Sequence, residues 1–136
     1  MKLEHVAINV AEPQAMAEWY EKHLGLRTVK QASEEPYMTF MADSSGRVMI
    51  EIYHNSSAQV PDYHSMNPLM LHFAFVSETP GDDKARLIAA GASQVSDEQM
   101  PDGSRIIMLR DPWGVPLQLC KRASPLLADA EYPPED

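Results

Sequence analysis

Hydrophobic and polar residues alternate along residues 3–10, a pattern that predicts a β-strand with Val6, Ile8 and Val10 packed on one face. Apolar residues then recur at helical spacing within residues 16–24, between Pro13, which suits a first turn, and Gly25, which suits a helix end. Three strand-like runs follow, at residues 26–30, 37–42 and 47–53. The predicted order of elements in this half is therefore β-α-β-β-β.

The same order recurs in the second half of the chain. Its predicted elements are a strand at 69–76, a helix at about 81–90, and strands near 92–99, 104–110 and 115–121. Two polar pairs shift with the repeat: His72 follows His5 by 67 residues, and Gln118 follows Glu51 by the same interval. Self-similarity of this kind indicates two copies of one supersecondary unit.

The length of the chain favours one domain over two. A chain of 136 residues can bury one substantial core, so the two repeats are expected to be half-domains. We predict a single domain over residues 1–122, made of modules 1–54 and 69–122, with a polar, proline-containing linker at 55–68. Residues 123–136 carry three prolines and four acids, which predicts a flexible acidic tail.

Composition narrows the class of protein. A hydrophobic content of 44% with 23% charged residues is typical of a globular protein. The sequence contains no apolar run of about 18 residues, so we predict no membrane-spanning helix. The lone cysteine, Cys120, and the lack of a signal-peptide pattern favour a cytoplasmic location. A net charge of −9 disfavours binding to nucleic acid, whose phosphates are also negative, so we expect a small molecule as the binding partner.

Four polar residues lie on the strand faces that the hydrophobic pattern leaves open: His5, Glu51, His72 and Gln118. Taken singly, each has an ordinary structural explanation, because strand histidines are usually hydrogen-bonded and strand glutamates exposed or ion-paired. The matched spacing favours a metal site, since two imidazoles, a carboxylate and an amide oxygen suit Zn²⁺, Ni²⁺, Mn²⁺, Fe²⁺ or Co²⁺. A decayed site that binds an organic ligand without metal is the alternative.

Three further side chains receive structural interpretations. His23 ends the first predicted helix, where a cationic imidazole favours the helix dipole. His54 is predicted to face away from Glu51 and to be solvated, and Cys120 is predicted to be a small buried thiol.

Three segments carry a resemblance to a known family: residues 3–10 (LEHVAINV), 19–26 (WYEKHLGL) and 110–119 (RDPWGVPLQL). With them the chain resembles the vicinal oxygen chelate superfamily, which includes glyoxalase I, bleomycin-resistance proteins and extradiol dioxygenases. The resemblance implies an α+β fold of two tandem βαβββ modules, whose mixed sheets curl around a central cavity. It also implies a homodimer.

The resemblance further implies that His5, Glu51, His72 and Gln118 are the metal ligands. The family normally has a glutamate at the fourth position, and a carboxamide can ligate a metal but cannot act as a general base. An epimerase-like set of His, Gln, His and Glu has here become His, Glu, His and Gln. This implies that Glu51 is the base, with a metal-stabilised enediolate.

Three functions remain open. The first is a metal-dependent lyase or isomerase of the glyoxalase type, acting on a small α-oxygenated carbonyl compound. The second is a non-catalytic dimeric binder of the bleomycin-resistance type that sequesters a cationic molecule, which the net charge of −9 favours slightly. The third is a dioxygenase with a neutral fourth ligand.

Overall fold

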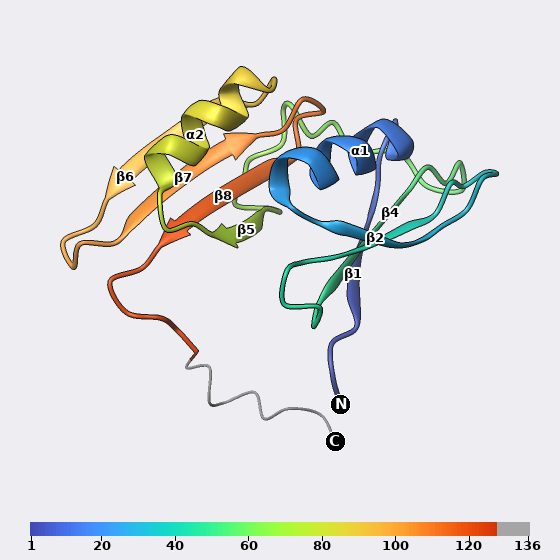
Figure 1. The fold of residues 1–136 in the computed structure, drawn as a ribbon. Coiled ribbons are helices and arrows are strands. Elements are labelled where there is room, and N and C mark those ends of the chain that lie inside the picture. The colour runs from blue at the N-terminus through green and yellow to red at the C-terminus, as the bar shows by residue number, and fades with distance from the viewer. Residues whose placement is uncertain (128–136) are drawn as a thin grey trace. The chain divides into compact units, whose positions relative to one another are not determined.

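The chain divides into two compact units, a first unit from Met1 to Met66 and a second unit from Asn67 onward. The computed structural model describes residues 1–127. Each unit contains one helix and a four-stranded mixed sheet, so the predicted α+β class with two tandem βαβββ modules is confirmed (Figure 1). The single-domain assignment, with its linker and tail, stays a prediction.

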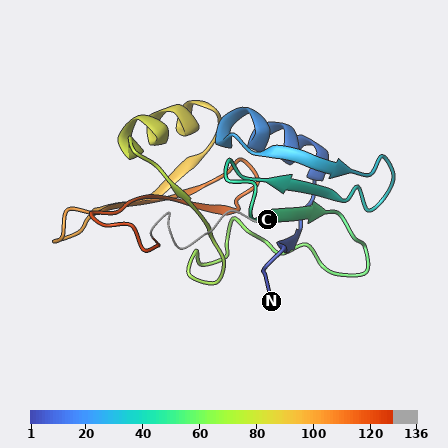
Figure 2. The same ribbon diagram turned by 60° about the horizontal axis from the view of Figure 1, so that its bottom comes forward.

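The first unit comprises β1 (His5–Asn9), α1 (Pro13–Leu24), β2 (Arg27–Gln31), β3 (Thr39–Ala42) and β4 (Met49–Tyr53). Its strand order is β1-β4-β3-β2, with β1 parallel to β4 and the other pairs antiparallel. Figure 2 shows α1 on one face of this sheet, where Met16 and Tyr20 are fully buried.

The second unit comprises β5 (Phe73–Val76), α2 (Pro80–Ala89), β6 (Ser93–Gln99), β7 (Arg105–Arg110) and β8 (Pro116–Lys121). Its strand order, β5-β8-β7-β6, is that of the first unit, with β5 parallel to β8. The helix α2 lies over the sheet (Figure 1), and it buries Leu87 completely.

The parallel strand pairs repeat with a constant offset of 67 residues. Ala7 pairs with Glu51 in the first unit, and Ala74 pairs with Gln118 in the second. An equivalent backbone hydrogen bond follows each of the strands β1 and β5. Val10 N donates to the Tyr53 carbonyl at 2.8 Å, and Ser77 N donates to the Cys120 carbonyl at 3.0 Å. Glu51 and Gln118 therefore occupy equivalent places in two copies of one backbone.

The helix ends follow from local sequence. Both helices begin with a proline in the first turn, where its missing N–H leaves no bond unmade. Gly25 ends α1 in the left-handed conformation, with φ of 70°, a conformation that costs glycine nothing. Neither helix within residues 1–127 is long and apolar enough to cross a membrane.

The strand predicted over 69–76 begins later, at Phe73. Asn67 holds a turn at this point, with its carbonyl accepting from Met70 N and its Oδ1 accepting from Leu69 N, both at 2.9 Å. In the first unit the ladder is extended by a bond from Met49 N to the Glu4 carbonyl at 3.1 Å. The equivalent residue is Pro116, which has no N–H to donate.

The predicted packing face of β1 is only partly buried. Ile8 and Val10 are buried as expected, whereas Val6 is 41% exposed. The reason is the place of β1 at the edge of its sheet, because α1 packs over β2, β3 and β4.

The segment predicted as a linker, 55–68, is largely held by the first unit. Asn9 Nδ2 donates to the carbonyls of Asn55 and Ala58, each at 3.0 Å, and the buried Tyr63 hydroxyl donates to the Asn9 carbonyl at 2.6 Å. Of the predicted tail, residues 123–127 are exposed and residues 128–136 lie outside the described part of the chain.

A charged cluster ties α2 to its sheet. Asp97 on β6 accepts bonds from Lys84 Nζ at 2.7 Å and from Arg105 Nε and Nη2 at 2.9 and 2.8 Å. Hydrogen bonds from Arg105, and then from Lys84, hold the pKa of Asp97 well below its ordinary value. The folded state therefore favours the ionised carboxylate.

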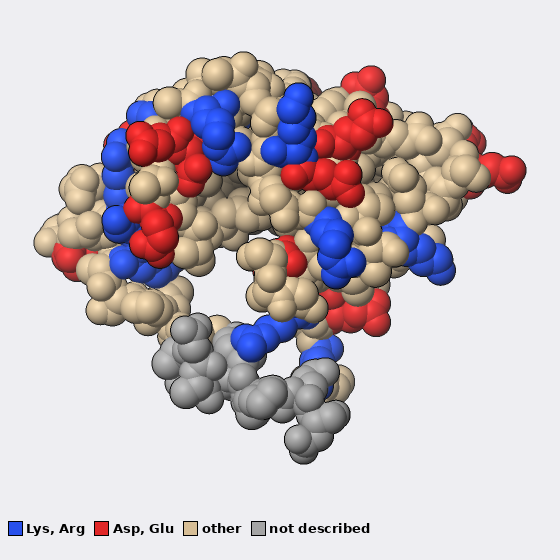
Figure 3. All heavy atoms as spheres, in the orientation of Figure 1, with Lys and Arg blue, Asp and Glu red and all other residues tan. Residues whose placement is uncertain are grey.

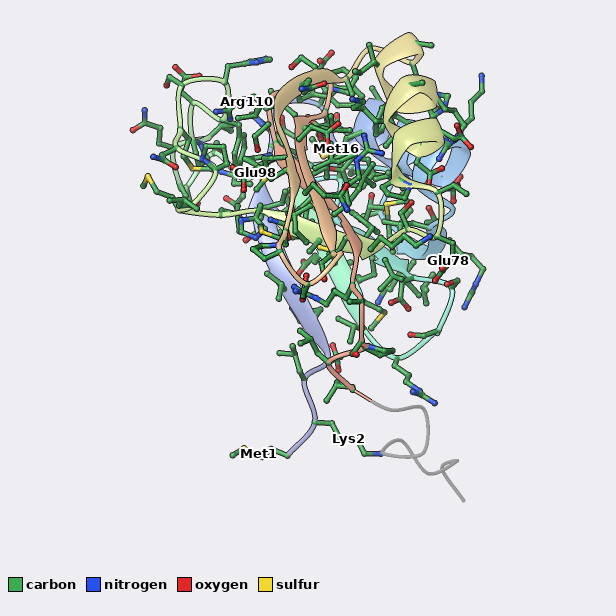
Figure 4. The ribbon with its side chains drawn as sticks, turned by 90° about the vertical axis from the view of Figure 1, so that its left-hand side faces the viewer. Met1, Lys2, Met16, Glu78, Glu98 and Arg110 are labelled. Atoms are coloured by element: carbon green, nitrogen blue, oxygen red, sulfur yellow. The ribbon has the colours of Figure 1, made fainter. Side chains whose placement is uncertain are left out.

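We expect Asp97→Asn to lower the free energy of unfolding by about 1–2 kcal/mol at neutral pH, because the substitution leaves two cations without their anion. A carboxyl whose pKa is lowered by folding stabilises above its unfolded pKa of about 3.9, and this contribution is lost as pH falls towards the folded value. Urea unfolding at several pH values measures the difference between wild type and variant, which should narrow in acid. A difference that stays constant from pH 7 to pH 2 contradicts this role of the ionised Asp97. Glu98→Gln, an exposed acid on the same strand (Figure 4), is the control.

Candidate functional site

The structure brings two of the four predicted site residues together. His5 lies on β1 and Glu51 on the adjacent strand β4, and His5 Nε2 is 3.2 Å from Glu51 Oε2. The Glu51 side chain is 14% exposed and that of His5 is 33% exposed. The Phe40 ring meets the imidazole edge to face, with ring centroids 5.2 Å apart. The pair is thus half-buried beside an aromatic wall.

The separation of the two facing atoms suits a shared metal ion. Zinc binds nitrogen and oxygen ligands at about 2.0–2.1 Å, and at a tetrahedral angle two such ligands lie roughly 3.3 Å from each other. His5 Nε2 and Glu51 Oε2 are 3.2 Å apart. The distance is that of a direct ion pair, and it also suits two adjacent ligands of one divalent cation.

His72 lies in the second unit, one residue before β5. Its Nδ1 is 2.8 Å from the Pro68 carbonyl, which can only accept, so Nδ1 donates. In the neutral imidazole Nε2 then carries the lone pair, which is the form that binds metal ions.

Gln118 lies on β8 and is half-buried. Its Oε1 accepts a hydrogen bond from the Cys120 thiol, with Sγ 3.0 Å away. A carbonyl oxygen has two lone pairs, so this bond leaves one for a further contact. The Gln118 amide is thus held by a residue of its own strand, whereas the Glu51 carboxylate contacts His5 on the neighbouring strand.

Within residues 1–127, no three side chains of His, Cys, Asp or Glu form a cluster that could hold a metal ion. The predicted set draws two such residues, His5 and Glu51, from the first unit and only His72 from the second, with Gln118 as the fourth ligand. The four-residue metal site accordingly stays a prediction, with each half described within its own unit.

One residue of the site, Glu4, was missed by sequence reasoning. His5 Nδ1 is 2.9 Å from Glu4 Oε1, so the imidazole lies between two carboxylates, those of Glu4 and Glu51. The signal available in the sequence was an acid immediately before a candidate ligand. Neighbouring side chains of a strand point to opposite faces, which argues against a contact between residues 4 and 5. Because β1 begins at His5, Glu4 lies outside the strand and its side chain can turn towards His5.

The remaining histidine and cysteine predictions have mixed outcomes. His54 is half-buried and its Nδ1 donates to the Val10 carbonyl at 2.8 Å, so the prediction of a solvated side chain was wrong. The strand β4 ends at Tyr53, and alternation does not reach the next residue. His23 packs against Trp19 in the last turn of α1, and Cys120 is buried as predicted.

A depression of about 390 Å³ lies at the start of α1 and includes Tyr37 and His54 in its lining. None of the four predicted site residues lines it. Its lining includes two acids, Glu12 and Glu18, and no lysine or arginine. On the face of the molecule shown in Figure 3, acidic and basic side chains are interspersed.

The comparisons with known proteins agree with this fold. The sequence profile of the glyoxalase/bleomycin resistance protein/dioxygenase superfamily matches residues 2–119. The chain belongs to this superfamily. No curated protein matches it as a relative.

Solved structures of the superfamily share the fold at low sequence identity. A superfamily member from Sphaerobacter thermophilus DSM 20745 is 15% identical with a TM-score of 0.70, covering 90% of this chain and 98% of its own. A lactoylglutathione lyase from Agrobacterium tumefaciens is 21% identical with a TM-score of 0.63, covering 87% and 91%. TnmS3, an antibiotic-binding protein from Streptomyces sp. CB03234, is 15% identical with a TM-score of 0.67, covering 88% and 93%. Similarity at this level shows the fold alone.

We expect the Cys120 thiol to resist alkylation in the folded protein, because only 6% of the residue is exposed. Burial also raises the pKa of this thiol, which keeps it in the less reactive protonated form. Iodoacetamide labelling followed by mass spectrometry should show little modification of native protein and complete modification in urea. Rapid labelling of the native protein would contradict the burial of this side chain.

Proposed function

We propose that this chain is a metal-dependent lyase or isomerase of the glyoxalase type, acting on a small α-oxygenated carbonyl compound. The observation that carries the proposal is the contact between His5 Nε2 and Glu51 Oε2 at 3.2 Å. Two features of the repeat support it: Gln118 pairs with Ala74 as Glu51 pairs with Ala7, and His72 follows His5 by the same 67 residues. A cavity for an organic ligand has no need of an imidazole and a carboxylate at this separation.

In this proposal His5, Glu51, His72 and Gln118 hold one divalent cation, of Zn, Ni, Mn, Fe or Co. His5 and His72 contribute Nε2, and Gln118 contributes its amide oxygen. When bound, such an ion polarises a carbonyl group and stabilises negative charge that develops on its oxygen.

Glu51 is the proposed base. A carboxylate has two oxygens, so Oε1 can take a proton from the carbon next to the substrate carbonyl while Oε2 faces His5. Gln118 cannot fill that role, because an amide oxygen is too weak a base. Proton transfer is therefore assigned to the first unit alone, with Gln118 limited to ligation.

A second candidate function is a non-catalytic, homodimeric binder of a cationic small molecule. The net charge of −9 favours it, because an acidic protein attracts cations over long range. TnmS3, an antibiotic-binding protein, has the same fold. The two functions differ in their need for metal, which makes metal content the first discriminating measurement.

Protein purified without chelator should contain about one divalent ion per chain. His5→Ala and His72→Ala should each weaken metal binding by more than about 100-fold, since each removes an imidazole ligand. His64→Ala, on an exposed residue of the 55–68 segment, is the matched control and should leave affinity unchanged. Metal analysis gives the metal content, and chelator competition gives the affinity. An equal loss of affinity in all three variants, or wild-type protein without metal, contradicts the proposed site.

Glu51→Gln should lower the rate of proton removal by about 10²–10⁴-fold, because it replaces a base with an amide that can still ligate. The assay is exchange of carbon-bound hydrogen for deuterium in D₂O, followed by NMR over α-hydroxy and α-oxo carbonyl compounds with and without glutathione. Gln118→Glu is the control, since it leaves Glu51 in place and should not abolish exchange. Exchange by Glu51→Gln at the wild-type rate would exclude this residue as the base.

A further inference from the structure

We propose that Glu4 is a positioning residue for His5 and strengthens metal binding by the first unit, an inference that rests on the proposed metal site. Glu4 Oε1 is 2.9 Å from His5 Nδ1, a distance typical of a charge-assisted hydrogen bond. His5 Nε2, the other ring nitrogen, faces Glu51 Oε2. The contact with Glu4 thus orients the imidazole so that its ligating nitrogen meets the second ligand.

With a metal ion bound at His5 Nε2, the contact with Glu4 would complete a carboxylate–histidine–metal arrangement. A ligating histidine usually donates its other N–H to a carboxylate or carbonyl, which fixes the ring orientation and makes the ligating nitrogen a stronger donor. His72 has a backbone partner of this kind, the Pro68 carbonyl at 2.8 Å. His5 has a side-chain partner that carries a full charge.

The internal repeat shows that this contact is particular to the first unit. The residue equivalent to Glu4 is Leu71, which has no acceptor in its side chain. The two histidines are therefore held by different groups, Glu4 from the preceding position and Pro68 from four residues upstream. We assign the stronger metal–imidazole bond to His5, because its partner is anionic.

Glu4 can act in this way although its side chain is 72% exposed. The N-terminal segment extends away from the start of β1, where Met1 and Lys2 are labelled in Figure 4. Solvent weakens the contact energetically. It does not change the direction in which the ring is held, and the His5 side chain is also restrained by Phe40.

The test measures the Zn²⁺ dissociation constant by chelator competition in four proteins: wild type, Glu4→Leu, Glu4→Gln and Glu34→Gln. Glu4→Leu installs the residue of the second unit and should weaken binding by about 10–100-fold. Glu4→Gln keeps an acceptor without the charge and should fall between Glu4→Leu and wild type. Glu34→Gln removes an exposed charge of the same unit and should bind as wild type does. Thermal unfolding without metal should be the same in all four, because Glu4 is exposed.

A double-mutant cycle separates positioning from simple loss of negative charge. If Glu4 acts through His5, Glu4→Leu has no further effect in a His5→Ala background. An undiminished effect in that background, or wild-type affinity of Glu4→Leu, overturns the inference while leaving the proposed function intact. Wild-type protein that binds no Zn²⁺ overturns both.

Discussion

The parallel pairing of the first strand of each module with its last strand is the constraint on which the remaining structure depends. In both units the edge strand is set against the fourth strand in one register, so that Ala7 faces Glu51 and Ala74 faces Gln118. Side chains alternate strictly along a strand, and a slip by one residue would turn Glu51 from the open face into the face that packs under α1. Register therefore determines chemistry here, because it decides which face carries the polar residues.

The same backbone in two copies carries two different polar arrangements. In the first unit Glu51 reaches across to His5 on the neighbouring strand. In the second unit the Gln118 amide oxygen accepts a hydrogen bond from the Cys120 thiol on the same strand, and His72 Nδ1 donates one to the Pro68 carbonyl. The two units offer equivalent positions and carry different polar side chains there. A base on one side and a neutral ligand on the other is the chemical consequence that our proposal uses.

Sequence reasoning succeeded where the pattern is periodic and repeated. The shared interval predicted equivalent strand positions for Glu51 and Gln118, and hydrophobic alternation predicted the modules that carry them. His72, unlike His5, lies just before its strand. Sequence reasoning failed where a contact depends on non-local pairing. The late start of β5 follows from the missing N–H of Pro116, 43 residues away in sequence from Phe73.

The remaining differences have the same origin. Val6 has the pattern of a packed residue but lies near the start of an edge strand, on which α1 packs less than on β2, β3 and β4. His54 and Glu4 lie just outside β4 and β1, where alternation no longer fixes side-chain direction, so local contacts decide their roles. These are positions at which tertiary context overrides a local pattern.

In the proposed metal site, ligands from both modules bind one ion. Proton NMR of protein loaded with one equivalent of Co²⁺ tests this sharing, because the unpaired electrons of the ion shift the N–H signals of ligating imidazoles. A shared ion should give two shifted, exchangeable imidazole signals, one lost in His5→Ala and the other in His72→Ala. A spectrum in which the bound Co²⁺ shifts only one histidine, or neither, would contradict it.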